Sequence, residues 1–373
     1  MMQRVDREYM LRALSLAEKG RGSVSPNPMV GCVIVASSGE VIGEGYHRVY
    51  GEGHAEVNAL SSVEEGHRAE IVGSTVYVTL EPCSHFGKTP PCADRLVSER
   101  VARVVVGCTD PNPKVAGRGI QKLRDAGIEV VVGVEEEKCV ELNKRFFTAQ
   151  RFGRPYVILK WAETADGYLD AARPEGVAAA WFTSSEAKCL VHSWRAVEDA
   201  ILVGRKTAEK DNPSLTVREC SGRNPKRVVL SGSSVLDRGL SLFDSEASTI
   251  VYSSNALAYA DSSATVVEAV DSSLHFVLED MLSRGIQSVI VEGGAVVLTQ
   301  FLSEGLWDEI RLFKIKEPLS AFYPSLEESC LSGGVKAPRM EAYLHLVGQV
   351  ESRSEIEIGD STLYTLCRVC DFR

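Results

Sequence analysis

The chain has 373 residues, of which 44% are apolar and 25% are charged, and its formal net charge at pH 7 is −10. This length predicts two domains, and the composition is typical of a globular protein that can bury a core. The acidic balance argues against general binding to nucleic acid or anionic membranes, and no apolar run reaches the length of a transmembrane helix.

The N-terminal residues and the cysteines bear on the compartment. Residues 1–19 are charged throughout and lack the apolar centre of a secretory signal. Ten cysteines are scattered along the chain without the spacing of a disulfide framework. We therefore expect reduced thiols, with a metal-binding pair among them, and a cytoplasmic location.

The first part of the chain alternates helices and strands. Apolar periodicity predicts helices over 6–19, 54–60, 92–100 and 119–126, and strands over 30–35, 41–43, 75–80, 101–107 and 128–133. This alternation predicts an α/β sheet with helices on its faces. A charged, mostly helical stretch over 134–151 ends at Gly153-Arg154-Pro155. We place the boundary there, which gives domains of residues 1–150 and 151–373.

The second part repeats the α/β pattern. Strands are predicted over 155–160, 200–204, 226–230, 249–252 and 288–291, and helices over 183–195, 276–285 and 295–304. The stretch 317–339 has mixed periodicity and predicts no element. The second domain is therefore also predicted to be α/β.

Two short stretches of the first domain, His54-Ala55-Glu56 and Pro82 to Cys92, carry a metal-binding signature. One imidazole and the thiols of Cys83 and Cys92 suit tetrahedral Zn²⁺, one per chain, with a fourth position for water. Glu56 lies two residues after His54, where it can move protons without ligating the metal. Zinc deaminases use this pattern, H-x-E followed by P-C-x-x-C, although eight residues separate the cysteines here.

A structural zinc site is the alternative interpretation. Such a site needs four protein ligands, and His85 is a candidate for the fourth. Glu56 has no role in a structural site, which favours catalysis. In that case the metal lowers the pKa of a water, and Glu56 carries the water's proton to the amino group that leaves an amidine-like ring carbon as ammonia.

The first domain resembles the deaminase half of the bifunctional riboflavin-biosynthesis deaminase/reductase family. The resemblance rests on residues 25–31, 45–47 and 54–56 and on the long loop 82–92 with its wide cysteine spacing. It implies a cytidine-deaminase-like three-layer αβα fold. It also implies deamination of 2,5-diamino-6-(5-phosphoribosylamino)pyrimidin-4(3H)-one at the ring 2-position.

The same resemblance implies that Asn27, His47 and Lys88 hold the pyrimidine or the ribose phosphate. Read without it, Asn27 makes a Pro-Asn-Pro turn and Lys88 is a solvated loop charge. We favour the binding roles, because ligands gather on loops at strand ends.

Read from its residues alone, the second domain offers one weak site. Glu292-Gly293-Gly294 lies between a predicted strand and a helix, where backbone N–H groups can bind a phosphate or simply form a tight turn. The glycine fingerprint of dinucleotide-binding folds, G-x-G-x-x-G, is absent.

The resemblance continues through residues 160–167, 181–184, 195–196, 203–207 and 211–218. These are similar to the family's reductase half, which has a dihydrofolate-reductase-like fold and uses NADPH to reduce the ribosyl group to ribityl. The implied cofactor contacts are Ala162, Trp181, Thr207, Asp211, Gly293 and Gly294. The implied substrate contacts are Arg195, Leu215, Arg218 and Glu292, with the arginines pairing with the phosphate.

Lys160 is a candidate for proton transfer to the sugar, and equally a candidate salt-bridge partner at a strand end. Thr164 and Ala179 depart from the family pattern, and residues 312–322 lack the Ala-Pro-Lys-like sequence expected there. The last third of the reductase is therefore the part in which we most expect differences from the family's reductase half.

These observations predict a two-domain enzyme that catalyses two consecutive steps of riboflavin synthesis. One alternative is a single-activity deaminase whose second domain only binds nucleotide or supports assembly, and another is a non-catalytic structural-zinc protein. A deaminase of nucleic acid is disfavoured by the acidic charge and by the cysteine spacing. We expect a small-molecule substrate, no nucleic-acid or membrane partner, and a homo-oligomer.

Overall fold

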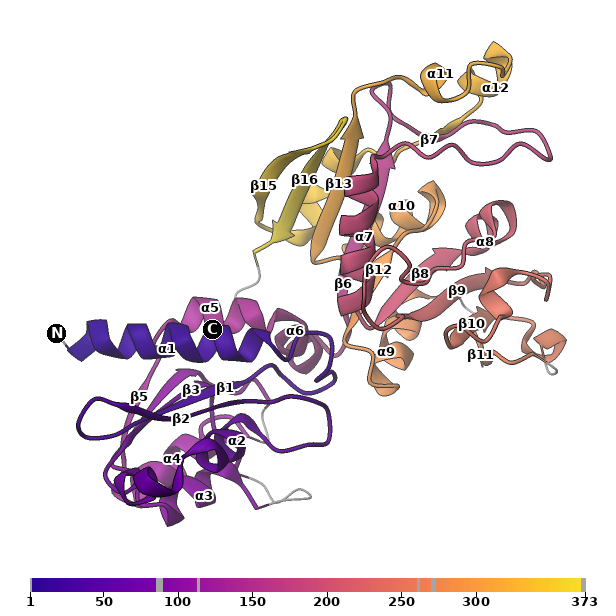
Figure 1. Ribbon diagram of the computed structural model, residues 1–373. Helices are drawn as coiled ribbons and strands as arrows, with labels where there is room; N and C mark the ends of the chain where they lie inside the picture. Colours follow the sequence, from indigo (N-terminus) through magenta and orange to yellow (C-terminus); the bar gives the residue numbers. More distant parts are fainter. Residues whose placement is uncertain (1, 85–89, 113–114, 260–261, 270–272, 370–373) are drawn as a thin grey trace. The chain divides into compact units, whose positions relative to one another are not determined.

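The computed structural model describes residues 2–84, 90–112, 115–259, 262–269 and 273–369. They form two compact units that divide between Gly153 and Arg154 (Figure 1). Within these ranges, no helix is both long enough and apolar enough to cross a membrane.

The N-terminal unit contains one five-stranded sheet of order β2-β1-β3-β4-β5. Strand β1 is antiparallel to both of its neighbours, whereas β3, β4 and β5 are parallel. The strands are β1 (Gly31–Val35), β2 (Val41–Tyr46), β3 (Thr75–Leu80), β4 (Arg103–Cys108) and β5 (Glu129–Val132).

Helices cover both faces of this sheet, which makes three layers (Figure 1). One face packs against α1 (Met2–Glu18), α5 (Glu136–Leu142) and α6 (Lys144–Phe152), and the other against α2 (Ala55–Ser62), α3 (Cys92–Ser98) and α4 (Arg118–Asp125). The 3-10 helix η1 (Glu65–Ile71) follows α2. Successive residues of a strand point to opposite faces, so Ile34 joins the α2 side of the core and Val33 joins the α1 side.

A glycine lets α2 approach the sheet closely. A Cβ added at Gly45 on β2 would lie 2.2 Å from the Ala59 backbone nitrogen on α2. No side chain fits there. This close packing brings the start of α2 next to the residues that follow β2.

The C-terminal unit is built on a nine-stranded sheet of order β11-β10-β9-β8-β12-β6-β13-β16-β15. The seven strands from β11 to β13 in this order are parallel, and β16 pairs antiparallel with both β13 and β15. The strands are β6 (Tyr156–Glu163), β8 (Ala200–Gly204), β9 (Lys226–Gly232), β10 (Thr249–Ser253), β11 (Thr265–Glu268), β12 (Ser288–Val291), β13 (Glu309–Ile315), β15 (Val350–Ile358) and β16 (Ser361–Arg368).

Three longer helices flank this sheet and bury its apolar strands. They are α7 (Ser185–Val197), α9 (Leu274–Ser283) and α10 (Ala295–Ser303). Helices α9 and α10 pack on Leu159 and Val291, whereas Trp194 of α7 packs on Ile158 and Ile290 from the opposite side. The side chain of Ser184 caps α7 by accepting from Ala187 N, and serine is a favoured residue at this position.

Shorter elements complete the unit. They are β7 (Tyr168–Asp170) paired with β14 (Val335–Lys336), α8 (Arg205–Asp211), α11 (Leu319–Phe322), α12 (Glu328–Ser332), and the 3-10 helices η2 (Ser241–Phe243), η3 (Ala256–Tyr259), η4 (Met340–Ala342) and η5 (Leu344–Val347). The divergent stretch 312–322 begins inside β13, which is hydrogen-bonded on both sides in the sheet. Its first four residues, 312–315, therefore still form part of an internal strand of the sheet.

Candidate active sites

Three metal-ligand types converge at one point of the N-terminal unit. His54 is the residue before α2, Cys83 follows β3, and Cys92 begins α3. The Nδ1 atom of His54 lies 3.5 Å from Cys83 Sγ and 3.4 Å from Cys92 Sγ. One ligand atom from each residue lies within 4.8 Å of the others. The structure thus brings together the three residues that the sequence predicts as ligands.

The spacing of these atoms fits Zn²⁺. Tetrahedral zinc with a Zn–N distance of about 2.0–2.1 Å and a Zn–S distance of about 2.3 Å places its nitrogen and sulfur ligands about 3.5–3.6 Å apart. The two measured Nδ1–Sγ distances agree with this value. Hydrogen bonding from the Cys92 thiol lowers the pKa of Cys83, and the Cys92 backbone N–H, 3.3 Å from Cys83 Sγ, acts in the same direction. Thiolate is the form that binds a metal.

Glu56 lies in the first turn of α2 and is buried. Burial raises the pKa of its carboxyl to about 7, and the nearby Cys83 sulfur acts in the same direction. A carboxyl group with a pKa near the working pH can both accept and return a proton. This placement beside the cysteines is what proton transfer at a metal site requires.

His47 and Asn27 form a polar pair next to the ligand histidine. His47 Nδ1 lies 3.1 Å from the Gly53 carbonyl, and Asn27 Nδ2 lies 3.1 Å from His47 Nε2. A carbonyl can only accept, so Nδ1 carries the proton and Nε2 accepts from the amide of Asn27. Burial lowers the pKa of His47, which favours this neutral form. Its ring meets the His54 ring edge-on, with centroids 5.7 Å apart.

No role for Glu81, which directly precedes the Pro-Cys motif, is predicted from the sequence. Its buried carboxylate accepts from the backbone N–H groups of Gly117 and Gly119, both at 2.9 Å. This caps the start of α4, where an acidic group also complements the helix dipole. The carboxylate thereby fixes the strand end that leads into Cys83. In the sequence, only the position of Glu81 directly before the Pro-Cys motif could have indicated this role.

Two predicted residues of this site, Lys88 and the alternative ligand His85, lie outside the described residues. Their assignments therefore stay predictions.

In the C-terminal unit, strand register gathers the predicted reductase residues. Strand β12 pairs in parallel with β6 and β8, and Val291 is level with both Leu159 and Leu202. The residues just beyond this level, Lys160 on β6 and Glu292 after β12, therefore share one edge of the sheet. Ligands of open α/β sheets bind at this carboxyl edge.

Glu292, Arg195 and Lys160 form a charged group at that edge. Arg195 donates from Nη2 and Nε to the two Glu292 oxygens, at 2.8 and 3.3 Å, and its side chain is 8% exposed. Burial alone would raise the pKa of Glu292, but the charges of Arg195 and Lys160 lower it to about 2. Burial lowers the pKa of Lys160, although the Glu292 charge opposes this.

The Gly293-Gly294 turn is tied to α8. Gly294 N donates to Thr207 Oγ1 at 3.1 Å. A Cβ at Gly293 would lie 2.9 Å from Val297 Cβ, so the turn packs tightly on α10. The structure thus brings together three of the predicted cofactor contacts.

Ala162 lies on β6, two residues after Lys160, and Trp181 lies in the loop before α7. Ala162 is half-buried on β6, level with Phe313 of β13. Trp181 is 59% exposed, and Lys188 Nζ lies 5.4 Å from its ring centroid. An exposed aromatic ring of this kind is available for stacking on a ligand.

Leu215 and Arg218 lie on the segment after α8. Leu215 has a φ of +54°, a region that L-residues other than Asn and Asp rarely adopt. Its side chain is buried in an apolar cluster with Val203 and Ala208. Any contact between Leu215 and the substrate is therefore made by its backbone. Arg218 is exposed, and its backbone N–H donates to Nδ1 of the buried His192 at 2.9 Å. No motif in the sequence marks this histidine.

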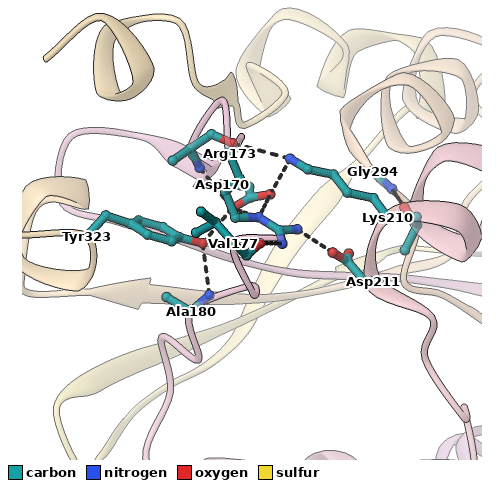
Figure 2. A network of polar contacts seen from close by, with 10 residues as sticks. Asp170, Arg173, Val177, Ala180, Lys210, Asp211, Gly294 and Tyr323 are labelled. Atoms are coloured by element: carbon teal, nitrogen blue, oxygen red, sulfur yellow. Dashed lines mark hydrogen bonds and ion pairs between the residues drawn. The ribbon is translucent and has the colours of Figure 1, made fainter. Parts of the chain in front are cut away.

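Asp211, the remaining predicted cofactor contact, ends α8 and accepts a hydrogen bond from Arg173 (Figure 2). The arginine belongs to the loop between β7 and α7, and no motif in the sequence marks it.

Comparisons with known proteins agree with this arrangement. Residues 3–108 match the family model described as "Cytidine and deoxycytidylate deaminase zinc-binding region", and residues 155–315 match "RibD C-terminal domain". The riboflavin biosynthesis protein RibD of Aquifex aeolicus is 42% identical over 319 residues, which is 84% of this chain and 87% of that protein. RibD of Escherichia coli K12 is 49% identical over 213 residues, 57% of this chain and 56% of that protein.

Solved structures are similar over the full length. A Thermotoga maritima protein described as a diaminohydroxyphosphoribosylaminopyrimidine deaminase/5-amino-6-(5-phosphoribosylamino)uracil reductase has a TM-score of 0.82 at 33% identity, covering 99% of this chain and 100% of that chain. RibD of Acinetobacter baumannii has a TM-score of 0.84 at 34% identity, with the same coverage.

The comparisons confirm the two predicted fold types, a cytidine-deaminase-like domain followed by a reductase domain. They also favour the two-activity interpretation over a single-activity deaminase and over a structural-zinc protein. The cofactors are Zn²⁺ for the deaminase and NADPH for the reductase. The chain belongs to the RibD family of bifunctional deaminase/reductases of riboflavin biosynthesis.

Proposed function

We propose that residues 1–150 deaminate 2,5-diamino-6-(5-phosphoribosylamino)pyrimidin-4(3H)-one, and that residues 151–373 reduce the ribosyl group of its product with NADPH. The final product is 5-amino-6-(5-phosphoribitylamino)uracil. The convergence of His54, Cys83 and Cys92 beside buried Glu56 carries the first assignment. The name of the Thermotoga maritima relative covers both activities.

In the deaminase, we propose His54 Nδ1 and the two cysteine sulfurs as the zinc ligands. When bound there, zinc supplies a Lewis acid that makes a water nucleophilic near neutral pH. Glu56 accepts the proton of that water and delivers it to the departing amino group. Because it lies in the first turn of a packed helix, its carboxylate needs little reorganisation between the two transfers.

We assign binding of the pyrimidine to Asn27 and His47, whose mutual hydrogen bond fixes the orientation of the Asn27 amide. Lys88 is proposed to hold the ribose phosphate, an assignment that rests on the family resemblance.

In the reductase, we propose that Ala162, Trp181, Thr207, Asp211, Gly293 and Gly294 form the NADPH site. NADPH supplies the hydride that reduces the sugar carbon. The exposed ring of Trp181 and the tight Gly293-Gly294 turn support this assignment.

The substrate set of the reductase is proposed to be Arg195, Leu215, Arg218 and Glu292. Arg218 is exposed, and of its guanidinium only Nη1 donates to a neighbour that the structure describes, Thr216 Oγ1 at 3.1 Å, whereas the Arg195 guanidinium is largely engaged by Glu292. Lys160 is proposed to assist proton transfer to the sugar. Its lowered pKa supports this role, because a less basic lysine releases a proton more easily.

The Glu56→Gln variant tests the deaminase assignment. The amide has the same shape but cannot accept the proton, so ammonia release should fall by about 100-fold or more while zinc content stays near one per chain. NADPH oxidation with the deaminated ribosylaminouracil should be unchanged, which controls for folding. Ammonia release at the wild-type rate would overturn the role of Glu56.

We also propose a cytoplasmic homo-oligomer without nucleic-acid or membrane partners. Eight of the nine described cysteines, all except Cys367, are free thiols, the usual state in a reducing compartment. Strand β15 lies at the edge of the nine-stranded sheet, and an edge strand can pair with a second copy.

A further inference from the structure

A group of charges joins three segments of the C-terminal unit (Figure 2). At its centre is Arg173, whose side chain is 2% exposed. Its Nε donates to both carboxylate oxygens of Asp170, at 3.0 and 2.8 Å, and its Nη1 donates to the Val177 carbonyl at 2.9 Å. Its Nη2 donates to the Asp211 carboxylate. One side chain thus connects the end of β7, the loop that follows it, and the end of α8.

Two more residues bind the same Asp170 carboxylate. The Tyr323 hydroxyl donates to it at 2.7 Å and accepts from the Ala180 backbone N–H at 2.8 Å. Lys210 of α8 also donates to it, at 3.0 Å. Residues 171–183 contain no helix or strand, so the path of this loop depends on such side-chain contacts.

The connected segments carry residues proposed for the cofactor site. Trp181 lies near the end of this loop, and because its ring is exposed, the ring is placed by its backbone rather than by burial in the core. Helix α8 carries Thr207, which holds the Gly294 turn. The contacts of Arg173 consequently set the position of the Trp181 loop relative to α8.

We propose that Arg173 is a positioning residue of the reductase, which aligns the Trp181 loop with α8 and so shapes the NADPH site. This inference rests on the proposed function of that site. Arg173 needs no contact with NADPH, because its side chain is 2% exposed and each of its three nitrogens already donates to Asp170, Val177 or Asp211. Lysine cannot replace it, because a single ammonium group lacks the planar fork that reaches three acceptors at once. The Asp211 carboxylate then contributes to the NADPH site in part by holding the Arg173 side chain in place.

The test compares Arg173→Gln, Arg173→Lys and Tyr323→Phe with wild type in the full-length zinc-loaded chain. Tyr323→Phe keeps the buried ring and removes only the hydroxyl that holds Ala180. Arg284→Gln is the matched control, since it removes an arginine that pairs with Asp280 on α9, outside this group. The readouts are the Kd for NADPH, and KM and kcat of the reductase measured separately. Ammonia release reports on the deaminase unit.

Folding of the reductase unit can be followed independently. All four tryptophans of the chain, Trp161, Trp181, Trp194 and Trp307, lie after residue 153. Tryptophan fluorescence during urea unfolding therefore reports on this unit alone. If Arg173→Gln shows no cooperative unfolding transition, its reductase unit is not folded. The NADPH Kd is then compared in the milder Arg173→Lys and Tyr323→Phe variants instead.

Arg173→Gln is expected to raise the Kd and KM for NADPH by about tenfold or more, since misplaced binding groups are costly. Its kcat at saturating NADPH should stay within about threefold of wild type. Arg173→Lys and Tyr323→Phe should change the Kd in the same direction by less, and Arg284→Gln should not change it. The inference would be overturned if the folded Arg173 and Tyr323 variants bound NADPH with the wild-type Kd, or if Arg284→Gln raised that Kd as much as they do. Either result would leave the proposed function of the site standing. A wild-type chain that fails to bind NADPH would overturn the proposed function of the site as well.

Discussion

At the scale of single residues, the pair between Arg195 and Glu292 links the reductase unit to pH. The folded-state pKa of Glu292, about 2, lies below its ordinary value of 4.5. A depressed carboxyl pKa contributes stability that is present above the unfolded pKa and is lost as pH falls through the folded one. The contribution is on the order of 3 kcal/mol at neutral pH.

Glu292→Gln should therefore lower the urea midpoint of the reductase unit at pH 7, when unfolding is followed by tryptophan fluorescence. The difference from wild type should shrink as pH is lowered from about 4.5 toward 2, because the wild-type carboxyl is then also neutral. A difference that is constant down to pH 3 would mean that the ion pair does not stabilise this unit.

His85 is the residue on which the structural-zinc alternative depends. We expect His85→Ala to retain about one zinc per chain, because the fourth position of a catalytic zinc belongs to water. Metal content of the purified variant measures this directly. Loss of zinc on this substitution would support His85 as a fourth ligand.

The residues of the zinc site were predictable because each is fixed by local sequence. His54 precedes a helix, Cys83 follows a strand and Cys92 begins the next helix, so the order of elements brings them together. Arg173 and Asp211 are 38 residues apart, and Arg173 belongs to no motif. Their pairing depends on how a loop packs on a short helix, which periodicity does not encode.

At the scale of secondary-structure elements, the packing of α4 on the strand end controls the deaminase site. A Cβ at Gly119 would lie 2.0 Å from the Pro82 carbonyl oxygen, directly before Cys83. Gly119→Ala must therefore push α4 and the strand end apart. We expect about 1–3 kcal/mol of destabilisation, weaker zinc retention against a chelator, and slower ammonia release.

Gly66→Ala is the control for this variant, since a Cβ at Gly66 meets nothing within 4 Å. It should behave as wild type in both assays. Equal behaviour of the two alanine variants would show that close packing of α4 does not support the metal site.

The elements that the sequence predicted are those with strong apolar periodicity, such as β6, β8 and β12 in the centre of the sheet. The hairpin of β15 and β16 was not predicted. Strand β15 is polar and lies at the sheet edge, where burial imposes no apolar pattern. The short elements α8 and β14 were also missed, because a few residues do not establish a period.

At the scale of the whole molecule, two chemistries occupy two separately built units of one chain. The first unit provides a metal site at strand ends and helix starts, and the second provides a charged edge where β6, β8 and β12 end in register. Each unit buries its own core, so we expect a substitution in one active site to leave the other activity intact.

A single coupled assay tests the two-step account directly. The purified zinc-loaded chain is given the diaminopyrimidine substrate and NADPH, and released ammonia and oxidised NADPH are measured together. We expect both to appear in equal amounts, with ammonia release preceding NADPH oxidation. Ammonia release without NADPH oxidation, also when the deaminated intermediate is supplied, would contradict the account and show a chain that only deaminates.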